Sequence, residues 1–200
     1  MPWSCGIGTR VSQVAIDGAG DGVPDSAQRG GGIGVTGMWT FLATDAMGFG
    51  GLFIAYGILR VRADVWPDPR TRLALAPAVA MTFALLASSL TMTLATRAAG
   101  LRARRVWLLA TLALGIAFLA GAAFEYAHLS MGLTSDLFAS TFYLLTGFHG
   151  LHVLAGVVGV AFMLRSRFGS QAVETMGLYW HFVDAAWMPI FSLVYLWPAR

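Results

Sequence analysis

Five long apolar stretches constrain this chain more than any other feature of its sequence. Each is long enough to cross a bilayer, which takes about 20 helical residues. None alternates apolar and polar side chains as a transmembrane β-strand does, and a helix satisfies its own backbone hydrogen bonds in lipid. The sequence therefore predicts an all-α, polytopic membrane protein built as a five-transmembrane-helix bundle. The predicted helices cover residues 36–59, 73–96, 106–128, 137–164 and 175–197.

Composition supports a membrane protein and argues against other classes. The chain is 57% hydrophobic and 12% charged, against about 45–50% and about 25% in a soluble domain. Its 13 basic residues are all arginines and give a net charge of only +3. Most of them separate apolar stretches instead of forming a solvated basic face, so we expect no nucleic-acid partner. The single cysteine, Cys5, excludes a disulfide within the chain and a cysteine metal cluster.

The first 34 residues differ from the rest of the chain. They are polar and rich in glycine, with glycine runs at 18–22 and 30–32, and they contain no apolar run. They are therefore not a secretory signal peptide, and we predict a flexible N-terminal tail over residues 1–34. The transmembrane domain is predicted to occupy residues 35–200.

The distribution of arginine predicts the orientation of the chain. With five spans the two termini lie on opposite sides of the membrane. Eight arginines fall on the side of the N-terminus and five on the other side. Because positive residues collect in the cytoplasm, the N-terminus is predicted to be cytoplasmic and the C-terminus periplasmic or extracellular.

Small residues recur at a spacing of four and indicate close helix packing. Three glycines concentrate in the first span, at Gly48, Gly50 and Gly51. We therefore expect this span to make a close contact, with a partner or with lipid. Pro189 falls inside the last span, where it is predicted to kink the helix. The spaced pairs are Thr44/Gly48, Ala46/Gly50 and Ala155/Gly159.

A few polar residues lie within the spans, where a charge costs roughly 2.5–3.5 kcal/mol and calls for a partner or a function. Counting at about 1.5 Å per residue places Asp45 and Asp184 at a similar depth, so they could share one cluster with His181. Glu125 and His128 fall near the opposite surface. We expect a proton network or lipid-associated sites at Asp45, Glu125, His149, His152, His181 and Asp184.

Three roles for these residues are consistent with the sequence. Histidines on facing helices could ligate haem or a metal; Asp45, His181 and Asp184 could relay protons; or the side chains could form hydrogen bonds that hold the bundle together. The pairs His149/His152 and His181/Asp184 each lie on one helix face. Motifs of soluble catalysis and of nucleotide binding are missing from the sequence. We therefore predict no catalytic residue and no metal ligand on this chain.

Two long motifs carry a family resemblance. The run STFYLLTGFHGLHV at 140–153 resembles the histidine-bearing helix of cytochrome c oxidase subunit III, and YWHFVDAAW at 179–187 resembles that family's last helix. Phe124-Glu125-Tyr126 and residues 37–53 match two further family segments in the expected order. The resemblance covers about residues 36–197. Five helices in place of the family's common seven resemble the short bacterial form, and Asp45 stands where the family often has Glu.

The resemblance implies an accessory role in aerobic respiration. A subunit III carries no haem or copper, which belong to subunits I and II; it stabilises subunit I, sustains proton uptake and binds phospholipid. The chain would then be a non-catalytic subunit of a proton-pumping haem–copper oxidase in the bacterial inner membrane, using cytochrome c or quinol. Its expected partners are subunits I and II, membrane lipid and, in a supercomplex, a cytochrome c reductase. The alternatives are an accessory subunit of nitric oxide reductase and a free-standing histidine-ligated cytochrome or transporter.

Overall fold

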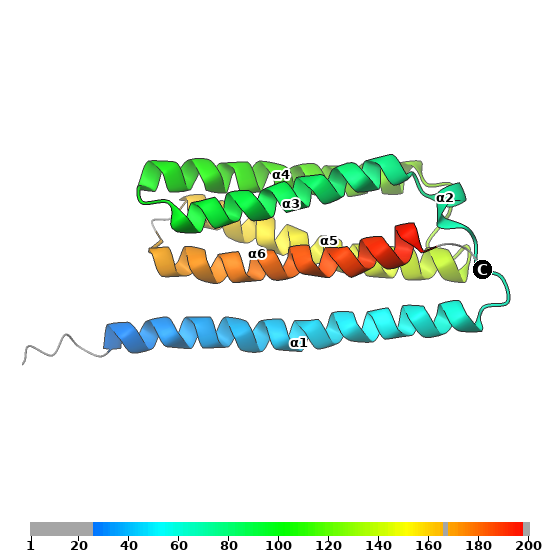
Figure 1. The fold of residues 1–200 in the computed structure, drawn as a ribbon, viewed down its shortest axis with the longest axis horizontal. Coiled ribbons are helices and arrows are strands. Elements are labelled where there is room, and N and C mark those ends of the chain that lie inside the picture. Colours follow the sequence, from blue (N-terminus) through cyan, green and yellow to red (C-terminus); the bar gives the residue numbers. More distant parts are fainter. Residues whose placement is uncertain (1–25, 166–167, 198–200) are drawn as a thin grey trace, which may run out of the picture.

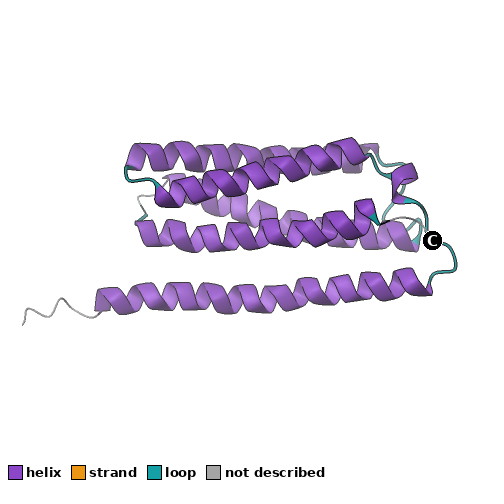
Figure 2. Cartoon of the chain, in the orientation of Figure 1, coloured by secondary structure: helices purple, strands orange, loops and turns teal. Residues whose placement is uncertain are grey.

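The computed structural model describes residues 26–165 and 168–197, with side chains from residue 34 onward. Within these ranges the chain consists of helices and short connections, without β-strands (Figure 2), which confirms the all-α prediction. The helices are α1 (Ser26–Arg62), α2 (Pro69–Arg72), α3 (Leu75–Arg97), α4 (Leu101–His128), α5 (Leu137–Arg165), α6 (Ser170–Phe191) and the π-helix η1 (Ser192–Leu196).

Four of the described helices are long and apolar enough to cross a membrane: residues Gly34–Arg62 of α1, and the whole of α3, α4 and α5. Helix α6 is not among these four, and it contains Glu174, His181 and Asp184. Its 22 residues are nevertheless about 33 Å long at the rise of an α-helix, and it packs against α1, α3 and α5. We therefore treat α6 as the fifth span of a polytopic helical bundle.

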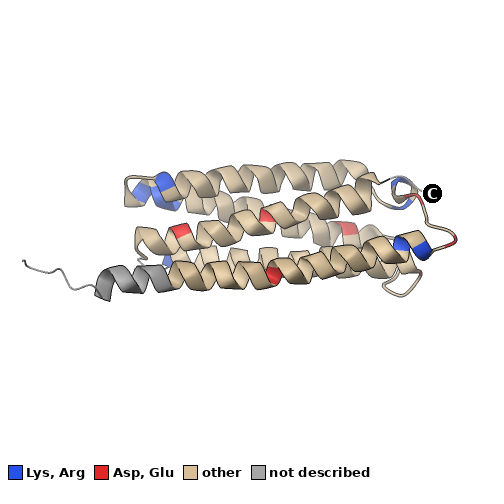
Figure 3. Cartoon of the chain, turned by 60° about the horizontal axis from the view of Figure 1, so that its bottom comes forward, with Lys and Arg blue, Asp and Glu red and all other residues tan. Residues whose placement is uncertain are grey.

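The five long helices run back and forth between two ends of the molecule (Figure 1). The start of α1, the α3–α4 connection and the α5–α6 connection lie at one end. We call it the arginine-rich end because Arg97, Arg102, Arg104, Arg105 and Arg165 gather there (Figure 3). The short helix α2 and η1 lie at the other end, which we call the α2 end.

Helices α3 to α6 form a closely packed unit, which we call the α3–α6 bundle. The Trp180 side chain lies between Gly115 of α4 and Gly156 of α5. A Cβ added at Gly156 would lie 2.8 Å from Trp180 Cζ3, and one at Gly115 would lie 2.9 Å from Trp180 Cη2. The Trp180 indole N–H donates to Ser88 Oγ of α3 at 2.9 Å. One fully buried side chain thus joins four helices.

Helix α1 is set apart from the α3–α6 bundle (Figure 1) and contacts mainly α6 and, less extensively, α5. A Cβ added at Gly48, Gly50, Gly51 or Gly57 would meet nothing within 4 Å. The glycines of the first span therefore make no close contact with the described part of this chain. Close approach at glycine occurs instead inside the α3–α6 bundle.

Helix boundaries extend beyond the apolar stretches. Helix α1 begins at Ser26, inside the stretch predicted as a tail of residues 1–34, and residues 1–25 lie outside the described ranges. Helices α4 and α6 begin about one turn earlier than predicted, at Leu101 and Ser170. Polar residues such as arginine are good helix formers, so hydropathy marks the buried part of a helix better than its ends. Pro189 lies inside α6, and the backbone changes to a π-helix from Ser192.

Candidate functional site

The carboxylate of Asp45 pairs with His152 across the boundary between α1 and α5. Asp45 Oδ1 lies 3.1 Å from His152 Nε2, and the two side chains are only 12% and 14% exposed. The other ring nitrogen, Nδ1, lies 2.8 Å from the carbonyl oxygen of Phe148. His152 is therefore held between its own helix and α1.

The geometry of the Asp45–His152 pair determines how many protons it holds. A carbonyl oxygen only accepts, so His152 Nδ1 carries a proton and donates it to Phe148. A hydrogen bond between Nε2 and Asp45 then requires one further proton, either on the imidazole or on the carboxyl group. In both forms the pair is neutral overall, which suits a site inside the membrane.

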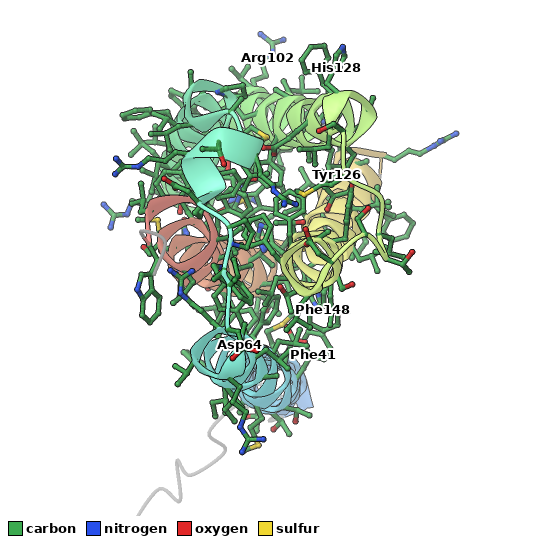
Figure 4. All side chains as sticks on the ribbon, turned by 90° about the vertical axis from the view of Figure 1, so that its right-hand side faces the viewer. Phe41, Asp64, Arg102, Tyr126, His128 and Phe148 are labelled. Atoms are coloured by element: carbon green, nitrogen blue, oxygen red, sulfur yellow. The ribbon has the colours of Figure 1, made fainter. Side chains whose placement is uncertain are left out.

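Aromatic side chains enclose this pair. Phe49 of α1 lies 5.1 Å from the His152 ring and 5.0 Å from the Phe148 ring, between ring centroids. Figure 4 shows Phe148 on the side of α5 that faces α1. The Tyr179 hydroxyl of α6 donates to the His152 carbonyl oxygen at 2.9 Å. Three helices thus meet at this pair, which reduces its contact with lipid.

His181 forms a second polar group, between α6 and α3. Its Nδ1 lies 2.7 Å from Ser89 Oγ, and its Nε2 lies 3.3 Å from Thr93 Oγ1. Asp184 lies one turn further along α6 and is buried, and neither carboxylate oxygen has a hydrogen-bond partner among the described residues. The structure therefore pairs Asp45 with His152, and not with Asp184 or His181.

Glu125 belongs to a third group, near the α2 end. The Tyr195 hydroxyl of η1 donates to Glu125 Oε2 at 2.8 Å, whereas Oε1 has no partner among the described residues. Glu125 also lines a small hollow together with Arg72 and His128. This carboxyl group is thus held by η1, the segment that follows the predicted kink.

His149 stands apart from the polar groups. Its ring is completely buried, and neither nitrogen has a hydrogen-bond partner in the described chain. The rings of Trp187, Phe118 and Phe49 surround it at centroid distances of 5.1, 5.6 and 6.4 Å. Apart from the Asp45–His152 pair, the six predicted site residues are not joined to one another by direct hydrogen bonds in the described chain.

Arg60 anchors the other end of α1, a role that the sequence did not reveal. It is 3% exposed, and its guanidinium carbon lies 4.7 Å from the Trp197 ring centroid and 5.5 Å from that of Trp66. Arg60 donates to the Tyr56 hydroxyl and to the Trp197 carbonyl, both at 3.3 Å. The Tyr56 hydroxyl in turn donates to the Leu193 carbonyl at 2.9 Å. We call Tyr56, Arg60, Trp66 and Trp197 the Arg60 clamp.

The sequence does not single out several side chains that anchor α1 or bind the predicted site residues, because each fits a common pattern of membrane helices. Arg60 is one of the arginines whose distribution indicates the orientation of the chain, and its spacing of four from Tyr56 puts both on one helix face. Ser89, Thr93 and Tyr195 were read as parts of apolar spans. The unusual number of hydroxyl residues in α3 was the available signal. These residues are Thr82, Ser88, Ser89, Thr91, Thr93 and Thr96.

An apolar groove separates α1 from α6 toward the arginine-rich end. It has a volume of about 430 Å³, and nearly all of its surface is hydrocarbon, with the half-buried His181 at its wall. We call it the α1–α6 groove. Its lining residues are Trp39, Leu42, Ala43 and Ala46 of α1 and Leu178, His181 and Phe182 of α6.

The described histidines do not converge on a common centre. His152 binds Asp45, His181 binds hydroxyl groups, and aromatic rings surround His149. In the part of the chain that the structure describes, no three His, Cys, Asp or Glu residues form a group suited to a metal ion. The arrangement is chemically capable of holding and exchanging protons inside the membrane.

Comparisons with known proteins match this chain to one family. The family model described as cytochrome c oxidase subunit III matches residues 27–199. The chain is 44% identical to cytochrome c oxidase subunit 3 of Synechocystis sp., over 80% of this chain and 74% of the relative. It is 37% identical to cytochrome c oxidase subunit 3 of Thermostichus vulcanus, over 81% of this chain and 86% of that relative. It is 35% identical to cytochrome c oxidase subunit 3 of Corynebacterium diphtheriae, over 80% of this chain and 85% of that relative.

Proposed function

Because the chain belongs to the cytochrome c oxidase subunit III family, we propose that it is the accessory, non-catalytic subunit III of a bacterial haem–copper terminal oxidase. In this role it associates with the oxidase complex through subunits I and II, which hold the haem and copper. It contributes to oxygen reduction by stabilising subunit I and sustaining proton uptake. The family names of its relatives favour an oxidase over a nitric oxide reductase.

The Asp45–His152 pair is the observation that supports this function best. It joins two segments of the family resemblance, Asp45 from residues 37–53 and His152 from residues 140–153, shares one proton in a neutral pair, and is shielded by Phe49 and Phe148. Such a pair supports proton exchange or a fixed attachment of α1, and it requires no redox group on this chain. The remaining site residues, Glu125, His149, His181 and Asp184, lie at other contacts between helices, where they support the packing of the bundle.

We assign bound phospholipid to the α1–α6 groove. A groove of about 430 Å³ with a hydrocarbon lining fits an acyl chain, because polar headgroups would lose their hydrogen bonds there. The exposed glycines of α1 leave that helix open to lipid or to a neighbouring subunit. The excess of arginine on the N-terminal side supports a cytoplasmic N-terminus in the inner membrane.

Co-purification tests the proposed function. An affinity-tagged chain isolated from its own host in mild detergent is expected to bring down the oxidase subunits I and II, with their haem spectrum and oxygen consumption. A cytochrome c reductase is expected in the same preparation if the oxidase belongs to a supercomplex. The chain expressed alone and supplied with haem is expected to show no Soret band. A stoichiometric Soret band on the isolated chain would instead support the free-standing cytochrome.

A further inference from the structure

The arginines at the arginine-rich end lack the acidic partners found at the other end. At the α2 end, Arg72 pairs with Asp136 and Arg60 lies in its clamp. At the arginine-rich end, five described arginines make no ion pair with a described Asp or Glu, and the exposed Glu174 in the second turn of α6 is the acidic residue of the described helix ends there. These arginines are Arg97, Arg102, Arg104, Arg105 and Arg165.

Two of these arginines line a hollow between three helices. Arg104 and Arg105 lie on one face of α4, between Leu101 and Leu108 at spacings typical of a helix face. Met163 of α5 and Val173 of α6 complete the walls together with Phe168. The Nε of Arg104 is buried and has no hydrogen-bond partner among the described residues. The hollow therefore contains a buried N–H donor, that of Arg104 Nε, whose acceptor is not among the described residues.

Two helix N-termini add to the positive potential at this hollow. Helix α4 begins after Gly100 and α6 begins after Gly169, and neither N-cap residue supplies a side-chain hydrogen bond. Neither helix has an acidic residue in its first turn. Both ends thus keep free backbone N–H groups and the positive end of the helix dipole. Guanidinium groups and free N–H donors together favour an oxyanion, and phosphate above all.

We propose that this hollow binds the phosphate of an anionic phospholipid headgroup, with Arg104 and Arg105 as its ligands. The side chains of Leu101 and Leu109 beside them are exposed and apolar, so an acyl chain can continue from the headgroup along α4. An acidic protein segment would find little to bind on that apolar surface. The hollow shares no lining residue with the α1–α6 groove and includes no residue of α1. Figure 4 shows Arg102, also of α4, on the opposite side of the molecule from Phe41 of α1. The lipid site does not depend on the proposed oxidase role.

Native mass spectrometry of the complete chain in detergent micelles tests this site. The number of bound lipids is measured during titration with phosphatidylglycerol and, separately, with the zwitterionic phosphatidylcholine. The native chain is expected to bind at least one phosphatidylglycerol about tenfold more tightly than phosphatidylcholine. The double variant Arg104→Gln/Arg105→Gln is expected to lose this preference, and Arg104→Lys/Arg105→Lys is expected to retain most of it.

A charge-matched control separates this site from a general effect of net charge. Arg62→Gln/Arg70→Gln removes two exposed arginines from the α2 end and is expected to leave the preference unchanged. Equal losses in the two double variants, or an unchanged preference in Arg104→Gln/Arg105→Gln, would overturn the proposal. Displacement of the lipid by inorganic phosphate would assign the site to free phosphate. Loss of a co-purifying subunit with lipid binding intact would assign it to a protein.

Discussion

Most of the glycines in the α3–α6 bundle lie against other side chains, whereas those in the described part of helix α1 face open space. In the bundle, Gly115 and Gly156 make room for the indole of Trp180, so that side chains and backbone fit closely. In α1, Gly48 and Gly50 face open space, and the helix is held by the buried Phe49 and by polar contacts at Asp45, Tyr56 and Arg60. The bundle is thus stabilised by its own packing, whereas α1 depends on discrete attachment points and leaves a surface for lipid or another subunit.

Adding a side chain at a bundle glycine should cause the largest effect. Gly156→Leu places its Cβ 2.8 Å from the rigid Trp180 ring, and overpacking of this kind costs about 1–3 kcal/mol or more. We expect about 3 kcal/mol of lost stability, measured as a lower midpoint of thermal unfolding of the full chain in detergent. The matched variant Gly50→Leu should change the midpoint little, because nothing lies near its Cβ. Equal losses in both variants would contradict the comparison.

Removing the cation of the Arg60 clamp should release one end of α1. Arg60→Met keeps the length of the side chain but loses two cation–π contacts and the hydrogen bonds to Tyr56 and Trp197. A desolvated cation–π contact is worth about 2 kcal/mol. We expect faster backbone hydrogen exchange in α1 and unchanged exchange in α3. Arg62→Met, two residues away and exposed, should leave exchange in both helices as it is.

Replacing Asp45 separates attachment from proton exchange. The amide of Asp45→Asn can donate to His152 Nε2, so the contact between α1 and α5 remains while the shared proton is lost. Asp45→Ala removes both, at an expected cost of about 1–2 kcal/mol. If the proton matters, both variants assemble with the oxidase but lose activity faster during turnover. Loss of activity in Asp45→Ala alone would show that the residue serves only to attach α1.

The smallest effect is expected from a single hydroxyl group inside the bundle. Ser89→Ala removes the 2.7 Å contact to His181 Nδ1 and should cost about 1 kcal/mol, measured as a small drop in the unfolding midpoint. Ser192→Ala is the control, since that exposed hydroxyl bonds only the Met188 carbonyl, one turn earlier in the last turn of α6. A loss in Ser89→Ala no larger than in Ser192→Ala would show that the His181 contact contributes little to the stability of the bundle.

Much of the fold and part of the site followed from the sequence. The apolar stretches predicted the long helices, because a span in lipid must bury its backbone polar groups within one helix. The polar positions Asp45, Glu125, His149, His152, His181 and Asp184 were also identified from the sequence. In the structure, His152 pairs with Asp45 and Glu125 pairs with Tyr195. The spacing of these residues along the chain predicts neither pairing.

The sequence by itself determined that this chain is helical, lies in a membrane and carries its polar residues at defined depths along the spans. Depth follows from counting residues along a helix. Only the tertiary structure decided which helices are neighbours and how each is rotated, and so which residues at one depth face each other. Asp45 and Asp184 were predicted at a similar depth, yet Asp45 faces His152 of α5 and Asp184 lies near Ser89 of α3. Rotation about the helix axis depends on packing, which is a property of all five helices together.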